Sequence, residues 1–254
     1  MPAISVTARK GDPADTSAEV RVLGLFDGDS APEGLAVAGE AKTAWQKIAV
    51  GTEEGRPVIL VGLGKREDWD AERARVAGAI AAGRASELGA KGISWTVPEG
   101  EGVAEGLVEG TLLKLYKFDR FKSSKDEEDE PAGIGSLELA STEHDFEIEA
   151  REARITAEAA NAARDLQNLP ANVANPTFLA ARAQEIAEEH SALEVEVFER
   201  DQIAEMGMGA FAAVAQGTYT DPKLIVMRYS PAETKGPHLG YVGKAVTFDT
   251  GGIS

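Results

Sequence analysis

Short apolar runs separated by polar turns dominate the first part of the chain. Val20–Phe26 (VRVLGLF) ends at the turn Asp27-Gly28-Asp29, and Pro57–Leu63 (PVILVGL) is apolar throughout. A continuous apolar run of this length is typical of a strand that is buried on both faces. Three further stretches are predicted to be extended: Ile93–Val97, Thr111–Phe121 and Ile134–Leu139.

A helix is predicted directly after the second of these strands. Asp68, Asp70 and Glu72 stand at its front, where the helix dipole favours negative charge. Apolar residues then recur at helical spacing as far as Leu88, and Gly89 is suited to end the helix.

The glycine-rich turn Gly62-Leu63-Gly64-Lys65 lies between that strand and that helix, where a phosphate-binding loop would stand. A dinucleotide fingerprint requires another glycine in place of Glu67, and a Walker loop requires Ser or Thr in place of Arg66. We therefore predict a tight strand-to-helix turn, with nucleotide binding as the weaker alternative.

The second part of the chain reads as helices alternating with strands. After residue 146, apolar residues recur at intervals of seven, four, three and four, which places them on one face of a long helix. They are Ile148, Ile155, Ala159, Ala162 and Leu166. A second helix is predicted from Thr177, and Asp201 is predicted to cap a short one. Strands are predicted over Leu193–Phe198, Lys223–Tyr229 and Leu239–Phe248.

This alternation predicts an α/β fold with a mostly parallel sheet covered by helices. A shift in composition near residues 141–145 predicts two domains, residues 1–145 and 146–254. The charged run Lys122–Gly133 (KSSKDEEDEPAG) could be an inter-domain linker. We favour a solvated loop that joins two strands of the first domain.

Composition narrows the classes of function. The 254 residues carry 43 acidic and 26 basic side chains, a net charge of −17 that argues against nucleic acid as a partner. The absence of cysteine excludes disulfides, thiolate zinc sites and a cysteine nucleophile. No apolar run is long enough to span a membrane and no signal peptide is recognisable, which fits a cytoplasmic protein. Adaptation to high salt is a further interpretation of the acidic excess.

The last segment, Val242–Ser254 (VGKAVTFDTGGIS), carries the candidate chemistry. Lys244 lies within an otherwise apolar predicted strand, where a buried ammonium is costly unless it is paired or neutralised. Asp249 follows at the carboxyl end of that strand, the edge at which α/β sheets form ligand sites. Both residues could serve as ligands of two divalent cations. The simpler alternative is a buried Lys–Asp ion pair. Because the two positions face opposite ways in a straight strand, convergence on one metal requires a bend.

The same segment closely resembles the first metal-binding motif of the leucyl aminopeptidase family (M17). The resemblance includes Ala163–Pro176 (ARDLQNLPANVANP), similar to the start of that family's catalytic domain, and Met206–Ser230. Residues 58–83 and 112–123 resemble its N-terminal domain, so the match extends from about residue 57 to Ser254.

The resemblance implies a mixed α/β N-terminal domain of the macro-domain type, followed from about Phe146 by the first part of an α/β/α peptidase domain. It implies that Lys244 binds one metal ion and that Asp249 bridges two, typically zinc, with manganese, magnesium or cobalt as substitutes. The implied reaction releases an N-terminal residue, often leucine, from a peptide. Members are cytosolic and usually hexameric.

One departure from the family pattern is large. The family's catalytic lysine, a further aspartate ligand and its Asn-Thr-Asp-Ala-Glu-Gly-Arg motif would all follow Ser254. We therefore expect no catalytic residue within these 254 residues, and a chain that is the inactive N-terminal portion of a longer enzyme. A function of another class stays open: a non-catalytic binding or oligomer-assembly module.

Overall fold

The computed structural model describes residues 4–37, 42–123, 133–233 and 236–248. These residues divide into two compact units, Met1–Asp165 and Leu166–Ser254. The division falls within one long helix, and each unit is described by itself below. Among the described residues, no helix is long and apolar enough to cross a membrane.

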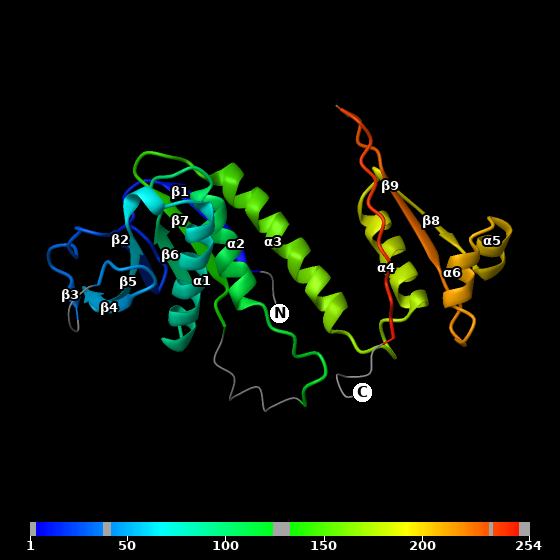
Figure 1. The fold of residues 1–254 in the computed structure, drawn as a ribbon. Coiled ribbons are helices and arrows are strands. Elements are labelled where there is room, and N and C mark those ends of the chain that lie inside the picture. Colours follow the sequence, from blue (N-terminus) through cyan, green and yellow to red (C-terminus); the bar gives the residue numbers. More distant parts are fainter. Residues whose placement is uncertain (1–3, 38–41, 124–132, 234–235, 249–254) are drawn as a thin grey trace. The chain divides into compact units, whose positions relative to one another are not determined.

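Unit 1 is built on one seven-stranded mixed sheet (Figure 1). Its strands are β1 (Ser5–Lys10), β2 (Val20–Phe26), β3 (Ala36–Val37), β4 (Ile48–Glu53), β5 (Arg56–Gly64), β6 (Gly92–Thr96) and β7 (Ser136–Ser141). The strand order is β1-β7-β6-β2-β5-β4-β3. The first five strands in this order run parallel, and β4 and β3 continue the sheet antiparallel. The predicted α/β class and the strands at 20–26, 57–63 and 93–97 are thus confirmed.

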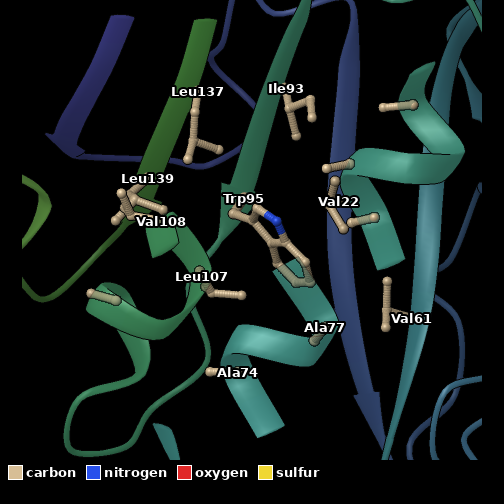
Figure 2. Close-up of a cluster of buried hydrophobic side chains, with 14 of the residues drawn as sticks. Val22, Val61, Ala74, Ala77, Ile93, Trp95, Leu107, Val108, Leu137 and Leu139 are labelled. Carbon is tan, nitrogen blue, oxygen red and sulfur yellow. The ribbon is translucent and has the colours of Figure 1, made fainter. Parts of the chain in front are cut away.

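The main core lies between one face of this sheet and three helices. They are α1 (Ala71–Glu87), α2 (Val103–Leu115) and the first part of α3 (Glu147–Asn168). Figure 2 shows Trp95 of β6 at the centre, among Val22 of β2, Ala77 of α1 and Leu107 of α2. Trp95 is fully buried, and small alanines on α1 leave room for its indole.

Helices α1 and α2 pack so closely that glycine is required between them. A Cβ at Gly110 would lie 1.8 Å from the Arg75 carbonyl oxygen, and one at Gly106 would lie 2.4 Å from the Ala71 carbonyl oxygen. The prediction of an extended segment over Thr111–Phe121 is therefore wrong, because α2 extends to Leu115 and residues 116–121 form no strand. Glycine disfavours isolated helices, and here the neighbouring helix supplies the stabilisation that local propensity lacks.

The charged run 122–133 joins α2 to β7, both in unit 1. The run therefore begins and ends in one unit, which argues against an inter-domain linker, and its flanking elements are a helix and a strand rather than two strands. Residues 124–132 themselves lie outside the described part of the chain.

Helix α3 confirms the predicted long helix but buries a different face. Its buried residues are Ala150, Ala153 and Ala157, which join the main core. Ile148 and Ile155, on the face predicted from spacing, are 59% and 55% exposed. Alanine contributes little to a hydrophobicity pattern, yet it allows a helix to approach its neighbours closely. For this reason spacing alone pointed to the wrong side.

Unit 2 contains α4 (Pro176–Glu189), α5 (Arg200–Glu205), α6 (Gly209–Val214) and a sheet of β8 (Leu193–Phe198) and β9 (Leu224–Tyr229). Asn175 caps α4 by accepting a hydrogen bond from the Phe178 amide at 3.0 Å, and the helix predicted from Thr177 is confirmed. The N-cap of α5 is Glu199, so the expectation that Asp201 caps this helix is wrong. Strands β8 and β9 are antiparallel, so the expected parallel arrangement holds in unit 1 only.

The predicted boundary at residue 145 stays a prediction. It precedes α3, whereas the division between the two compact units falls at Asp165–Leu166, near the end of that helix. The first half of α3 belongs to the core of unit 1 through its alanine face.

Candidate metal centre

Lys244 does not occupy a buried strand. The described residues of Leu239–Phe248 have no secondary structure, and Figure 1 draws them as a thin orange-red coil beyond β9. Leu239, Val242 and Phe248 are 77%, 102% and 78% exposed, and Lys244 is exposed as well. The predicted strand and the argument from a buried ammonium are therefore wrong for this structure.

The physical reason lies in strand pairing. A strand satisfies its backbone amides and carbonyls on a neighbouring strand, and an apolar strand also needs a covered face. Among the described residues, β8 and β9 pair only with each other, and no strand pairs with residues 239–248. The apolar sequence of this segment therefore has no partner there.

Asp249 lies outside the described residues, so its convergence with Lys244 on a metal ion stays a prediction. The described parts of the chain contain no group of three or more His, Cys, Asp or Glu side chains that could hold a metal ion. An amine nitrogen and a carboxylate oxygen are suitable donors for zinc or manganese. Two such ligands nevertheless leave most of a dinuclear coordination sphere to be supplied.

Ion pairs hold the elements that lead to this segment. The Arg200 guanidinium bonds Asp221 at 2.8 Å, and Lys223 pairs with Glu199, so the start of α5 is tied to the chain that enters β9. At the other end of the strand, the Ser230 amide donates to the Ala192 carbonyl at 2.8 Å. The last described element is therefore anchored at both ends, and Lys244 follows 15 residues after Tyr229.

The glycine-rich turn after β5 is occupied by protein backbone. The amides of Gly62 and Gly64 donate to the carbonyls of Lys47 and Thr43 at 2.7 and 2.9 Å, so neither is free for a phosphate. A Cβ at Gly62 would lie 2.2 Å from the Ala44 carbonyl oxygen, which explains this glycine. The carboxylate of Asp70 caps α1 and would repel an anion there. These contacts favour the structural turn over nucleotide binding.

The histidines offer no alternative site. His144, His190 and His238 are all exposed, and the His144 ring lies 5.8 Å from that of Phe146. A small pocket of about 130 Å³ lies beside His144, at the carboxyl ends of β6 and β7. Polar and apolar residues both line it, among them Thr96, Glu99 and Phe146.

A polar network on the second face of the sheet was not predicted. Burial opposes ionisation of Glu138, but hydrogen bonds from Arg9, Thr16 and Ser94 outweigh it and lower the pKa of this carboxyl group. Ser94 donates to Glu138 at 2.8 Å, and Arg9 donates at 3.3 Å. The sequence does contain a signal for this polar face: Ser136 and Glu138 alternate with leucines in β7, and side chains at every second position of a strand share a face.

Comparison with known proteins assigns the chain to a family. Residues 27–125 match the sequence model for the N-terminal domain of the cytosol aminopeptidase family, and residues 161–254 match the model for its catalytic domain. The chain belongs to the cytosol aminopeptidase family, M17. The resemblance found from its motifs is thereby confirmed.

Curated relatives carry the same name. The chain is 41% identical over 211 residues to "Probable cytosol aminopeptidase" of Nitratidesulfovibrio vulgaris, an alignment covering 78% of this chain and 41% of that protein. It is 35% identical over 264 residues to the same-named protein of Roseiflexus castenholzii, covering 98% of this chain and 54% of the relative. The chain thus spans about half the length of these curated relatives.

Solved structures show the same fold. A mutant of tomato leucine aminopeptidase matches with a TM-score of 0.79 at 23% identity, over 98% of this chain and 55% of that one. The bottromycin maturation enzyme BotP, in complex with Mn, matches with a TM-score of 0.71 at 24% identity, over 85% of this chain and 46% of that one.

Proposed function

We propose that this chain supplies the N-terminal domain and the first part of the catalytic domain of a dinuclear metal-dependent aminopeptidase. The substrates are peptides, from which an N-terminal residue is released, with leucine preferred. The single observation that carries the proposal is the match of the family's catalytic-domain model to residues 161–254, since it includes Lys244 and Asp249.

In this proposal Lys244 binds one divalent cation and Asp249 bridges two. Zinc or manganese is the expected metal, with magnesium or cobalt as substitutes, and the Mn complex of BotP supports manganese. When bound, two such cations activate a water molecule and polarise the scissile carbonyl group. Lys244 donates a lone pair only as a neutral amine, so binding of a cation at this nitrogen releases a proton.

The remaining ligands have to come from a polypeptide that follows these residues in the family pattern. We therefore expect the purified 254-residue chain to hydrolyse no leucine p-nitroanilide with added zinc or manganese. Metal-dependent turnover by this chain alone would contradict the proposal.

A chimera provides the direct test. We expect the 254 residues, fused to the part of the Nitratidesulfovibrio vulgaris relative that follows the matched region, to hydrolyse leucine p-nitroanilide in the presence of manganese or zinc. Lys244→Ala and Asp249→Ala should each abolish turnover, whereas His238→Ala, an exposed change in the same stretch, should preserve it. A folded chimera that is inactive, or one indifferent to both ligand changes, would refute the assignment.

The same proposal places the protein in the cytoplasm as a homo-oligomer, a hexamer in the complete enzyme. The names of its cytosol aminopeptidase relatives support the compartment.

A non-catalytic assembly module is the second candidate. The exposure of Lys244 favours it, because the described residues contain no group of His, Cys, Asp or Glu side chains that could complete a metal site. Calorimetric titration of the chimera with zinc separates the two functions. Tight binding that is lost in Lys244→Ala and Asp249→Ala indicates a metal centre, whereas an assembly module would be indifferent to both changes.

A further inference from the structure

Helix α3 is apolar on two opposite sides. One side, formed by Ala150, Ala153 and Ala157, is buried in unit 1. The other side carries five apolar residues, which we call the α3 stripe: Ile148, Ile155, Ala159, Ala162 and Leu166. At 3.6 residues per turn, Ile155 and Ala157 are about 200° apart around the helix. The stripe therefore points away from the core to which the helix is attached.

The stripe is more than a scatter of exposed apolar side chains. A helix attached to a core by one face normally presents polar residues on the other. Here Ile148 and Ile155 are 59% and 55% exposed and stand one heptad apart, and small alanines continue the line. Apolar residues at intervals of seven, four, three and four form a seam of the kind that another helix covers. The pattern therefore calls for a helical partner.

The charges beside the stripe indicate which helix that partner is. Arg151 and Glu158 lie on the same edge of the stripe, four residues before and three residues after Ile155. If two copies of α3 pack antiparallel with Ile155 near the two-fold axis, Arg151 of each copy faces Glu158 of the other. Arg151 has no ion-pair partner among the described residues of its own chain, whereas Arg154 pairs with Glu158 at 3.7 Å.

We propose that the α3 stripe is a two-fold interface on which a second copy of this chain docks its own α3 antiparallel. Ile155 faces its counterpart at the centre, with Arg151 and Glu158 of opposite copies paired along one edge. A two-fold contact is self-complementary, because the same surface serves on both copies. The proposal does not depend on peptidase activity or on the metal site.

Sedimentation equilibrium of the 254-residue chain tests the interface. We expect wild type to associate reversibly and Ile155→Glu to raise the dissociation constant at least tenfold, because the change places two carboxylates at the apolar centre. Ala160→Glu, an exposed change on the same helix outside the stripe, should leave the dissociation constant within twofold. Unchanged far-UV circular dichroism would show that both variants fold. A monomeric wild type, or association indifferent to Ile155→Glu, would overturn the proposal.

The absence of native cysteine allows a geometric test. A cysteine introduced alone by Ile155→Cys should yield a covalent dimer on mild oxidation, because position 155 faces itself across the two-fold axis. Ala160→Cys should remain uncrosslinked. Failure of Ile155→Cys to crosslink, or equal crosslinking of the two variants, would mean that the stripe is covered by something other than an antiparallel second copy.

Discussion

At the scale of single residues, close packing decides which positions tolerate change. Helices α1 and α2 approach so closely that Gly78, Gly106 and Gly110 each stand against backbone atoms of the other helix. Gly83 lies in α1 as well, but the nearest atom to its missing Cβ is the end of the flexible Lys114 side chain, at 3.2 Å. The glycines of these two helices therefore differ sharply in how much stability is lost when they are replaced.

Gly110→Ala should destabilise unit 1 by roughly 1–3 kcal/mol, because its new methyl group would overlap the Arg75 carbonyl and force the helices apart. Thermal unfolding measured by circular dichroism checks this. The control Gly83→Ala should be neutral or slightly stabilising, since alanine favours the helix and Lys114 can move aside. Equal melting temperatures for the two variants would contradict the packing argument.

Glu138 should give unit 1 an acid-sensitive contribution. Hydrogen bonds lower the pKa of its carboxyl group below the value in the unfolded chain, despite the opposing effect of burial. Its stabilisation is therefore complete above the unfolded-state pKa of about 4.3 and is lost as pH falls through the lower folded-state pKa. Glu138→Gln should cost roughly 1–2 kcal/mol at pH 7 and make the loss of stability below pH 5 shallower.

Denaturant titrations at several pH values measure this dependence. Glu143→Gln, which removes an exposed carboxylate from the connection after β7, is the matched control and should leave the profile unchanged. A Glu138→Gln profile parallel to that of wild type would show that the network contributes nothing to acid stability.

At the scale of elements, the helices of unit 1 differ in how far they depend on local capping and how far on tertiary packing. Helix α1 begins after Asp70, which accepts a hydrogen bond from the Arg73 amide at 2.8 Å. The acidic residues at this position indicate the start of the helix in the sequence. Helix α2 begins at Val103 after the N-cap Gly102, which supplies no side-chain cap, and it contains glycines at its contact face, so its formation depends on α1 and the sheet. Helix α3 lies between these cases, with a clear helical pattern whose buried side was set by alanine packing.

Asp70→Ala should therefore destabilise unit 1 by about 1 kcal/mol, since it leaves an amide at the start of α1 without its acceptor. Asp70→Asn retains an oxygen acceptor and should restore most of the loss. Chemical denaturation of the two variants provides the comparison, and an Ala variant as stable as wild type would show that the cap is dispensable.

At the scale of the whole molecule, two features dominate: the net charge of −17 and the exposed apolar side chains near the end of unit 2. Leu239, Tyr241, Val242 and Phe248 are each at least 77% exposed, which is unusual for so many large apolar side chains within ten residues. In the proposed enzyme these residues are covered when the catalytic domain is complete.

The acidic surface predicts a dependence on salt. Self-repulsion among like charges is screened as ionic strength rises, so the melting temperature should increase between about 0.01 and 0.15 M NaCl. A further rise into the molar range, together with loss of the fold in low salt, would favour adaptation to high salt. A melting temperature independent of salt would show that the charge is too dispersed to matter.

The sequence by itself determined the elements whose signals are local: the buried strands β2 and β5, the capped helices α1 and α4, and the family motifs up to Ser254. Those signals reside in contiguous residues, so no partner is needed to recognise them. Only the tertiary structure decided that α2 is a helix, that α3 buries its alanines, and that the segment around Lys244 is an exposed coil. Each of these depends on which surface lies opposite, and a backbone or side chain adopts a buried state only where another element is present to cover it.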